Sequence, residues 1–194
     1  MLHAHLELLK SMTITLILGP MYSGKSTELI KRVRRHFISK QQCLLIKYNA
    51  DIRYSNKVTV CTHDMYDSGI IPCVAFGKTI DLSNINIDST TVVGIDEGQF
   101  YDNLADICLS LSDSGKTVYV SALNGTYMKK IFSTVAELIP HCDDIIYLTA
   151  VCDKCHKDAV YSHRLVNSED IELIGGTNVY VALCRKCSIL PTEE

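Results

Sequence analysis

Short apolar runs, rich in β-branched residues and separated by polar stretches, recur between residues 12 and 151. Their length and their lack of a helical period are typical of buried strands in a parallel sheet. We expect five such strands, over residues 12–18, 43–48, 90–95, 117–123 and 145–151.

A helical period follows the first of these runs. Between residues 26 and 40, Leu29, Val33 and Phe37 recur at four-residue spacing beside Ile30, which predicts a helix with one buried face. The opposite side is basic, and a solvated helix face explains this more simply than an anion-binding patch. Its basic residues are Lys31, Arg32, Arg34 and Arg35.

A second helix is expected over residues 103–114, before Gly115. Strands that alternate with helices predict an α/β fold, in which a parallel sheet is flanked by helices. Residues 53–73 have no clear period and suit a mobile loop or a short hairpin. After about Val151 the chain becomes a series of short pieces punctuated by cysteines. We therefore expect an N-terminal extension over residues 1–11, an α/β domain over 12–147 and a small C-terminal domain over 148–194.

The composition favours a folded protein without a large nucleic-acid surface. Of 194 residues, 47% are hydrophobic and 21% are charged, so a proper core can form. The net charge of −3 lacks the basic excess typical of nucleic-acid-binding surfaces. The sequence has no signal peptide pattern and no apolar run of membrane length. We expect a soluble, intracellular protein that binds neither nucleic acid nor membrane.

Residues 19–26 match the pattern G-x-x-x-x-G-K-[ST] at every specified position. Gly19 and Gly24 would let backbone N–H groups wrap a polyphosphate closely. Lys25 would reach the β- and γ-phosphates, and the Ser26 hydroxyl would ligate Mg²⁺. Because the pattern lies between a predicted strand and the N-terminus of a predicted helix, it predicts a nucleoside triphosphate site with Mg²⁺. Its residues are Gly19, Pro20, Met21, Tyr22, Ser23, Gly24, Lys25, Ser26 and Thr27.

Two acidic residues follow the apolar run that ends at residue 95. Asp96 is the first polar group to emerge from this strand, where a P-loop protein needs a carboxylate to hold Mg²⁺. Glu97 stands beside it and can take a proton from the group that attacks the γ-phosphorus. If the attacker is water the protein is an ATPase, and if it is a substrate hydroxyl the protein is a kinase. The position of Glu97 alone leaves both open.

Four of the nine cysteines form two C-x-x-C pairs that are separated by 28 residues. Four thiolates from two such pairs make a tetrahedral structural Zn²⁺ site with no open position for catalysis. Two disulfides or ordinary core cysteines are the alternatives, and an intracellular chain disfavours disulfides. The long spacer indicates a sizeable loop between the pairs. The expected ligands are Cys152, Cys155, Cys184 and Cys187, with His156 and His163 as available substitutes.

Taken together, these motifs resemble the cytosolic-type (type II) thymidine kinase family of animals, bacteria and large DNA viruses. The likeness runs from about Thr13 to Cys187, and the Asp-Glu-Gly-Gln-Phe string at 96–100 and the cysteine quartet are its most specific parts. The other matching strings are the eleven residues at 19–29, Lys47-Tyr48 with Asp51 and Arg53-Tyr54, Cys61-Thr-His-Asp64, Gly115-Lys-Thr117, Leu123-Asn-Gly-Thr126, Leu148-Thr-Ala-Val-Cys152 and Ile174-Gly-Gly176.

The resemblance implies a P-loop (RecA-like) parallel sheet and a small zinc-binding domain that carries a lasso loop. It implies ATP-dependent phosphorylation of the 5′-hydroxyl of thymidine or deoxyuridine, with Glu97 as the base that takes the hydroxyl proton. Ser26 and Asp96 would organise Mg²⁺, while Lys25 and Arg53 would bind the transferring group, which needs charge neutralisation. The remaining residues of the implied ATP site are Asp51, which would orient that arginine, and Gln99.

The same resemblance places the nucleoside under the loop between the cysteine pairs, which zinc would anchor at both ends. Backbone groups of residues 171–175 would meet the polar edge of the base, and Tyr180 would pack against the nucleoside. Met21 and Leu123 would line the space for the 5-methyl group, and residues 53–73 would form a lid over the phosphates. The full implied nucleoside set is Met21, Phe100, Leu123, Tyr127, Phe132, Ser162, Ile171, Glu172, Leu173, Ile174, Gly175 and Tyr180.

The chain departs from the family pattern at three positions. It has Asn124 where relatives often have Asp, Tyr127 where Phe is common, and Ser162 where Thr is common. Ser162 lacks a methyl group near the expected base, which leaves the preference between thymidine and deoxyuridine open. The sequence stops seven residues after Cys187, without the long C-terminal tail of the animal enzymes, and this favours a viral or bacterial source.

The family also implies a homotetramer that dTTP inhibits and that works in pyrimidine deoxynucleotide salvage in the cytoplasm, or in the host cytoplasm for a viral protein. The alternative function is a P-loop ATPase that acts on nucleic acid through its zinc-binding domain. The lack of a basic surface, the single short core and the long spacer disfavour this ATPase.

Overall fold

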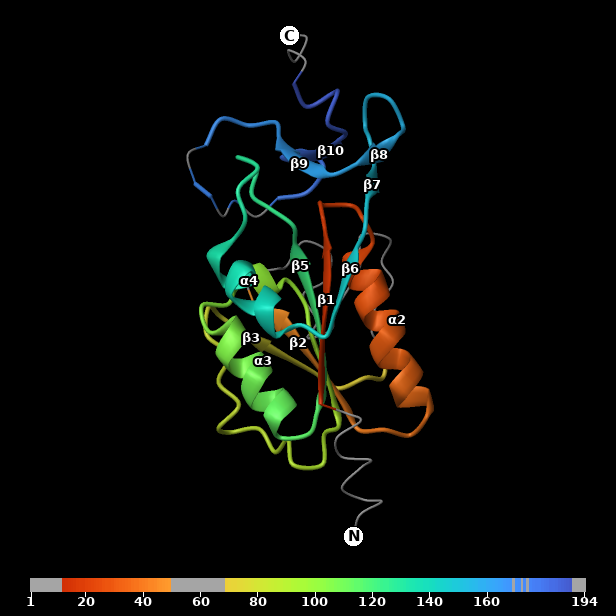
Figure 1. Cartoon of the computed structure of the whole chain (residues 1–194), viewed down its shortest axis with the longest axis vertical. Coiled ribbons are helices and arrows are strands. Elements are labelled where there is room, and N and C mark those ends of the chain that lie inside the picture. The colour runs from red at the N-terminus through yellow and green to blue at the C-terminus, as the bar shows by residue number, and fades with distance from the viewer. Residues whose placement is uncertain (1–11, 50–68, 169, 172, 174, 190–194) are drawn as a thin grey trace.

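A six-stranded sheet forms the centre of the computed structural model, which describes residues 12–49, 69–168, 170–171, 173 and 175–189. Its strands are β1 (Thr13–Gly19), β2 (Cys43–Tyr48), β3 (Cys73–Phe76), β4 (Val92–Ile95), β5 (Thr117–Leu123) and β6 (Asp144–Tyr147). They lie in the order β3-β2-β4-β5-β1-β6, each parallel to its neighbours (Figure 1). The predicted α/β class with a parallel sheet is confirmed.

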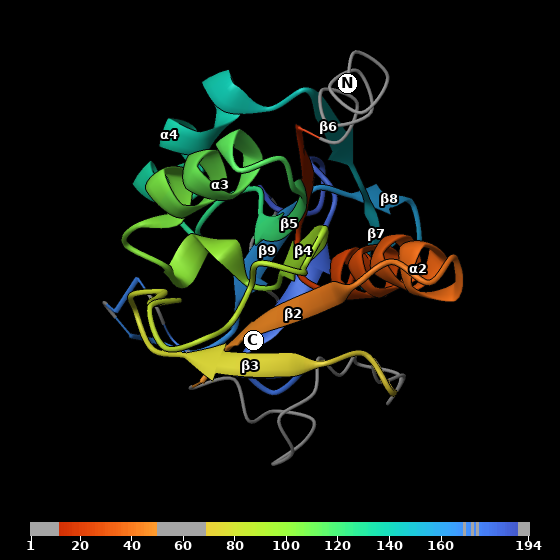
Figure 2. The same cartoon turned by 90° about the horizontal axis from the view of Figure 1, so that it is seen from below.

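Helices cover both faces of this sheet. α2 (Lys25–Ile38) lies on one face, and α3 (Leu104–Asp113) and α4 (Ser133–Leu138) lie on the other (Figure 2). Because successive side chains of a strand point to opposite faces, Ile17 of β1 packs with α2, whereas Leu16 packs with α3 and α4. Within the described part of the chain, no helix combines the length and the apolar character that a bilayer crossing requires.

The predicted apolar face of α2 is confirmed, because Leu29, Ile30 and Val33 are buried and Phe37 packs against their cluster. On the opposite side, the Glu28 carboxylate pairs with Lys31 Nζ at 3.1 Å and with Arg32 Nε at 2.8 Å. These two basic residues therefore belong to an ion-paired surface, as expected for a solvated helix face. The other two basic residues of this helix face, Arg34 and Arg35, are both exposed.

The prediction of a single strand over residues 145–151 was wrong. β6 ends at Tyr147, and β7 (Ala150–Val151) pairs with β8 (Asp158–Ala159) in a separate two-stranded sheet. The backbone N–H of Leu148 still donates to the Leu18 carbonyl at 2.7 Å, but β1 ends one residue later. Without a neighbour to pair with, the apolar run leaves the central sheet.

β3 and α4 were not predicted. Among the described residues, β3 pairs with β2 alone at the edge of the sheet, and its apolar run of four residues is too short to identify a strand. α4 is only six residues long, which is too short to show a helical period. Both elements pack into the same core cluster, through Val74 and Phe76 of β3 and through Val135 and Leu138 of α4.

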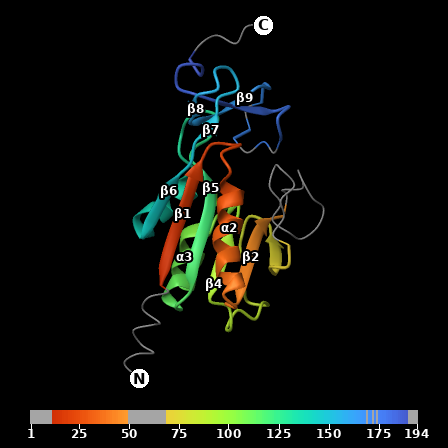
Figure 3. The same ribbon diagram turned by 90° about the vertical axis from the view of Figure 1, so that its right-hand side faces the viewer.

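The C-terminal part stands beyond the carboxyl ends of the parallel strands (Figure 3). Here β9 (Tyr161–Arg164) pairs antiparallel with β10 (Tyr180–Leu183). A small apolar cluster joins these strands to β7 and β8; it contains Ala150, Cys152, Ala159, Ala182, Leu183, Cys184 and Cys187. The predicted domain boundary between residues 147 and 148 stays a prediction, and the predicted extension over residues 1–11 lies outside the described residues.

Candidate active site

The phosphate loop connects β1 to α2 at the carboxyl edge of the sheet. A Cβ on Gly19 would lie 2.5 Å from Ser23 Oγ and 2.7 Å from the Leu148 carbonyl oxygen, so the chain needs glycine there. Gly24 has a φ of 80°, in the left-handed region that glycine adopts without strain, and α2 begins at the next residue. The helix N-terminus therefore opens onto the loop, as an anion-binding site requires.

Asp96 is held at the end of β4 by two hydroxyl groups. Ser26 Oγ donates to Asp96 Oδ1 at 3.0 Å, and Ser121 Oγ of β5 donates to the same oxygen. Asp96 is only 5% exposed, so this arrangement fixes the carboxylate. A hydroxyl and a carboxylate side by side are hard oxygen ligands that fit Mg²⁺. The sequence predicted the pairing of Ser26 with Asp96 but gave no signal for Ser121, whose role comes from β5 lying beside β4.

Lys25 folds back over the loop. Its Nζ atom donates to the Pro20 carbonyl at 2.7 Å, and the Ser23 hydroxyl donates to the same carbonyl at 2.8 Å. The ammonium group is thus already positioned above the segment where the β- and γ-phosphates of a bound nucleotide are expected.

Glu97 stands directly after Asp96 in a left-handed backbone conformation, with φ 54° and ψ 44°. A non-glycine residue in this region is uncommon and is often found at functional sites. Gln99 Nε2 donates to Glu97 Oε2 at 2.5 Å, while Gln99 Oε1 accepts from the Leu123 N–H at 2.9 Å. Gln99 is 3% exposed. It therefore ties the half-buried Glu97 carboxylate to the end of β5.

Behind these two carboxylates lies Tyr101, whose side chain is fully buried. Among the described residues no group bonds to its hydroxyl. Burial raises the pKa of Tyr101 far above its ordinary value, and the Asp96 and Glu97 charges raise that pKa further. Tyr101 therefore stays protonated.

The phosphate loop also contacts the C-terminal part directly. The Met21 N–H donates to Ser162 Oγ on β9 at 2.9 Å, and both residues are buried. The Tyr22 hydroxyl donates to the Tyr180 carbonyl on β10 at 3.2 Å. The structure thus brings together four residues that were predicted to contact ATP or the nucleoside, where the phosphate loop meets β9 and β10; they are Met21, Tyr22, Ser162 and Tyr180.

Arg164 was not predicted, although its guanidinium donates five hydrogen bonds and lies over the Tyr127 ring. It ends β9, is 8% exposed, and lies against Tyr127, Tyr180 and the segment after residue 167. No motif or spacing in the sequence distinguishes this arginine from a surface one.

The other predicted nucleoside residues are more dispersed. Phe100 stacks on Tyr48 with ring centroids 4.9 Å apart, and Phe132 packs against the same cluster beneath α3 and α4. Ile171 is 51% exposed. Four predicted site residues lie outside the described residues, namely Asp51, Arg53, Glu172 and Ile174, as does most of the predicted lid.

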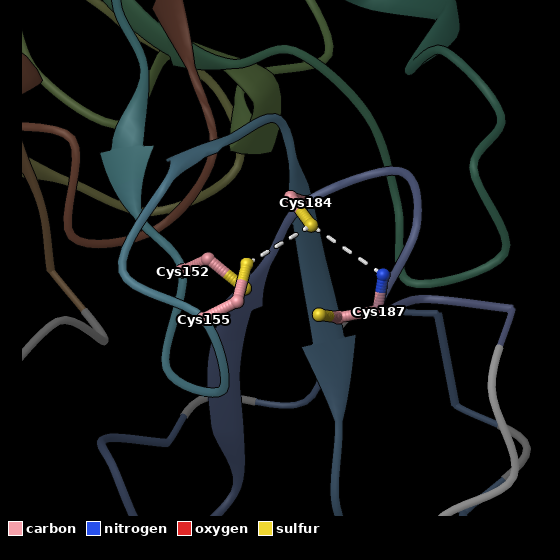
Figure 4. A group of neighbouring side chains, drawn as sticks. All are labelled: Cys152, Cys155, Cys184 and Cys187. Atoms are coloured by element: carbon pink, nitrogen blue, oxygen red, sulfur yellow. Dashed lines mark hydrogen bonds between the residues drawn. The ribbon is translucent and has the colours of Figure 1, made fainter.

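The four predicted zinc ligands converge in the C-terminal part (Figure 4). The Sγ atoms of Cys152, Cys155, Cys184 and Cys187 all lie within 4.8 Å of one another. The Sγ atoms of Cys155 and Cys184 are 3.6 Å apart, close to the edge of about 3.8 Å in a tetrahedron with Zn–S bonds of ~2.3 Å. The four sulfur ligands and the distances between them fit Zn²⁺. His156 and His163 are not part of the cluster.

Disulfides are not the explanation, because all eight cysteines among the described residues are unbridged. Burial raises the pKa of the Cys152 thiol, but backbone N–H groups nearby outweigh burial and bring that pKa to about 6. The pKa of Cys187 is raised to about 12, chiefly by its hydrogen bond with Cys155. A divalent cation would let all four deprotonate.

A P-loop at the end of β1 and an Asp-Glu pair at the end of β4 define a P-loop nucleotide-binding protein with a four-cysteine, zinc-type cluster. A family model described as "Thymidine kinase" matches residues 12–188. The chain therefore belongs to the thymidine kinase family, as its motifs predicted.

Named relatives agree with this family. The thymidine kinase of Raccoon poxvirus is 46% identical over 179 residues, which cover 91% of this chain and 96% of the relative. The thymidine kinase of Rabbit fibroma virus (strain Kasza) is 44% identical, covering 90% of this chain and 94% of the relative. The protein called "Thymidine kinase, cytosolic" of Homo sapiens is 41% identical, covering 90% and 72% respectively.

Proposed function

We propose that this chain is a thymidine kinase that transfers the γ-phosphoryl group of ATP to the 5′-hydroxyl of thymidine. Membership of the family makes it an enzyme of the kinase class that uses ATP and thymidine as its small-molecule substrates. The observation that carries the choice of a kinase over an ATPase is the contact of the phosphate loop, at Met21 and Tyr22, with a second site wall on β9 and β10. A water molecule as the attacking group would need no such wall.

In this proposal Glu97 is the general base. It would accept the proton of the 5′-hydroxyl as the new P–O bond forms, and the Gln99 bond at 2.5 Å would keep its carboxylate in position. Lys25 would bind the β- and γ-phosphates, while Ser26 and Asp96 would hold Mg²⁺. When bound, that ion neutralises charge on the phosphates.

The family pattern supports further parts of the proposal. Zn²⁺ would be bound by the four clustered cysteines as a structural ion. Arg53, oriented by Asp51, would bind the transferring phosphoryl group, and residues 171–175 would meet the base. We further propose a homotetramer that dTTP inhibits and that acts in the cytoplasm, in deoxynucleotide salvage.

The direct test is to incubate the protein with thymidine and Mg-ATP and to identify the products. We expect thymidine 5′-monophosphate and ADP in equal amounts. The rival function, an ATPase that acts on nucleic acid, predicts hydrolysis of ATP that DNA stimulates, with thymidine unchanged. That second result would overturn the proposed function.

A further inference from the structure

We infer that Arg164 is a positioning residue, which holds the described part of the lasso loop (165–168, 170–171, 173 and 175–179) in the shape that receives the pyrimidine. This inference rests on the proposed function, since it concerns the acceptor side of the same site. Arg164 is the last residue of β9 and is 8% exposed, so a buried cation lies directly at the start of the loop.

Every N–H group of the Arg164 guanidinium is used within the protein. A guanidinium has five N–H donors. Nη1 donates to the carbonyls of Ser168 at 3.0 Å and Asp170 at 2.5 Å, and Nη2 donates to the carbonyl of Ile171 at 3.2 Å. The Tyr180 hydroxyl accepts the other two, from Nη2 at 2.7 Å and Nε at 3.2 Å. No donor is left for a nucleoside, so Arg164 acts through the loop.

The Tyr180 hydroxyl is saturated in the same way. It accepts two bonds from Arg164 and donates its proton to the Leu173 carbonyl at 2.9 Å. A hydroxyl has one donor and two acceptor sites, so none remains. Arg164 and Tyr180 together thus hold four carbonyls of the loop, and only the Tyr180 ring is available to pack against a base.

The charge of Arg164 is balanced by aromatic faces and carbonyl dipoles. Its guanidinium carbon lies 3.8 Å from the centroid of the Tyr127 ring and 5.3 Å from that of Tyr180. Among the described residues, no ion pair involves Arg164. The Tyr127 hydroxyl also donates a long hydrogen bond, of 3.5 Å, to the Ser168 carbonyl. A planar, five-donor cation is needed here, and lysine, with three donors on a point charge, cannot replace it.

Arg164→Lys tests this inference, with Arg185→Lys as the matched control. The Arg185 guanidinium also lies over a tyrosine, 5.6 Å from the Tyr161 ring, but on an exposed residue. For Arg164→Lys we expect the KM for thymidine to rise at least about tenfold, whereas kcat and the KM for ATP stay within about threefold. Hydrogen exchange of residues 165–179 should become faster in the same variant. Arg185→Lys should match the wild type in all four measurements.

A wild-type KM for thymidine and wild-type exchange in Arg164→Lys would overturn the positioning role. So would equal losses in the ATP and thymidine parameters, which indicate general destabilisation. If Arg164→Lys does not fold, Tyr180→Phe serves instead, because it removes the hydroxyl that accepts two hydrogen bonds from Arg164. Faster hydrogen exchange of residues 165–179 in Tyr180→Phe would support the positioning role, and wild-type exchange would overturn it. Absence of thymidine phosphorylation by the wild type would instead overturn the proposed function. In that case the positioning role of Arg164 would be tested by the hydrogen-exchange measurement alone.

Discussion

The two sides of the site are built by different means. On the side of the phosphate donor, Gly19, Asp96 and Ser121 stand at or near the ends of three adjacent parallel strands, so backbone ladders set their positions. On the side of the acceptor, β9 and β10 have four residues each, and the chain between them is held by the Arg164 network and bounded by the cysteine cluster. The donor side therefore inherits the stability of the sheet, while the acceptor side depends on a few side chains.

The two sides meet where the loops after β1 and β5 contact the C-terminal part. The Met21 N–H donates to Ser162, the Tyr22 hydroxyl donates to the Tyr180 carbonyl at 3.2 Å, and the Asn124 amide donates to the Val160 carbonyl at 2.9 Å. Changes on one side should therefore affect the other side through these two loops.

Glu97→Gln should have the largest effect. Gln keeps an oxygen that can accept the Gln99 amide but cannot take the hydroxyl proton, so kcat should fall by about 10²- to 10⁴-fold. Mg-ATP and thymidine should still bind, which calorimetry can verify. Glu137→Gln, on an exposed residue of α4, is the control. An unchanged kcat in Glu97→Gln would remove Glu97 from the mechanism.

Ser121→Ala should affect only the donor side. It removes one of the two hydroxyls that fix the Asp96 carboxylate, and hydrogen bonds to charged groups contribute about 1.5 to 3 kcal/mol. We expect the KM for Mg-ATP to rise roughly tenfold in steady-state assays, with the KM for thymidine unchanged. Ser114→Ala, which removes a hydroxyl bond to the Leu111 carbonyl beyond α3, should leave both values unchanged. Equal increases in both KM values would argue against a separate donor side.

Asn124→Ala should weaken the junction between the two sides. The bond to the Val160 carbonyl across the junction is lost, as is the bond to Tyr147 of β6. This should cost about 1 to 2 kcal/mol of stability and lower the Tm by roughly 2–8 °C. Asn103→Ala is a matched control, because Asn103 also makes two bonds, both to Ile80 within the sheet part. Only Asn124→Ala should raise the KM for thymidine. The same increase in both variants would mean that stability alone is measured.

Glu28→Gln should have the smallest effect, since it breaks only surface pairs on α2. Each such pair contributes about 0.3 to 0.5 kcal/mol, so the loss of both should lower the Tm by less than about 4 °C in thermal denaturation. Burial raises the pKa of Glu28, but its bonds to Lys31 and Arg32 outweigh burial and lower that pKa. The contribution is therefore present at neutral pH and is lost as the pH falls below the ordinary value of 4.5. A large loss of thermal stability at neutral pH would contradict this and would show that the Glu28 ion pairs do more than decorate the surface of α2.

The same contrast explains which features could be predicted from the sequence. The phosphate loop and the Asp96–Glu97 pair are local patterns at strand ends, and the cysteine quartet follows from spacing alone. Ser121 and Arg164 depend on strand order and on the path of an irregular loop, and neither leaves a periodic pattern. The break between β6 and β7 was missed because β1, a distant segment, decides where the sheet stops.

The central claim is that the acceptor side can be lost while the donor side stays intact. Calorimetric titration of Mg-ATP and of thymidine, before and after treatment with a chelator that would remove the proposed zinc ion, tests it most directly. We expect the Kd for Mg-ATP to stay within about threefold, because the donor residues lie on the sheet, and thymidine binding to weaken at least about a hundredfold, because metal binding and folding are coupled in such sites. Parallel loss of both ligands, or unchanged binding of thymidine, would contradict this account.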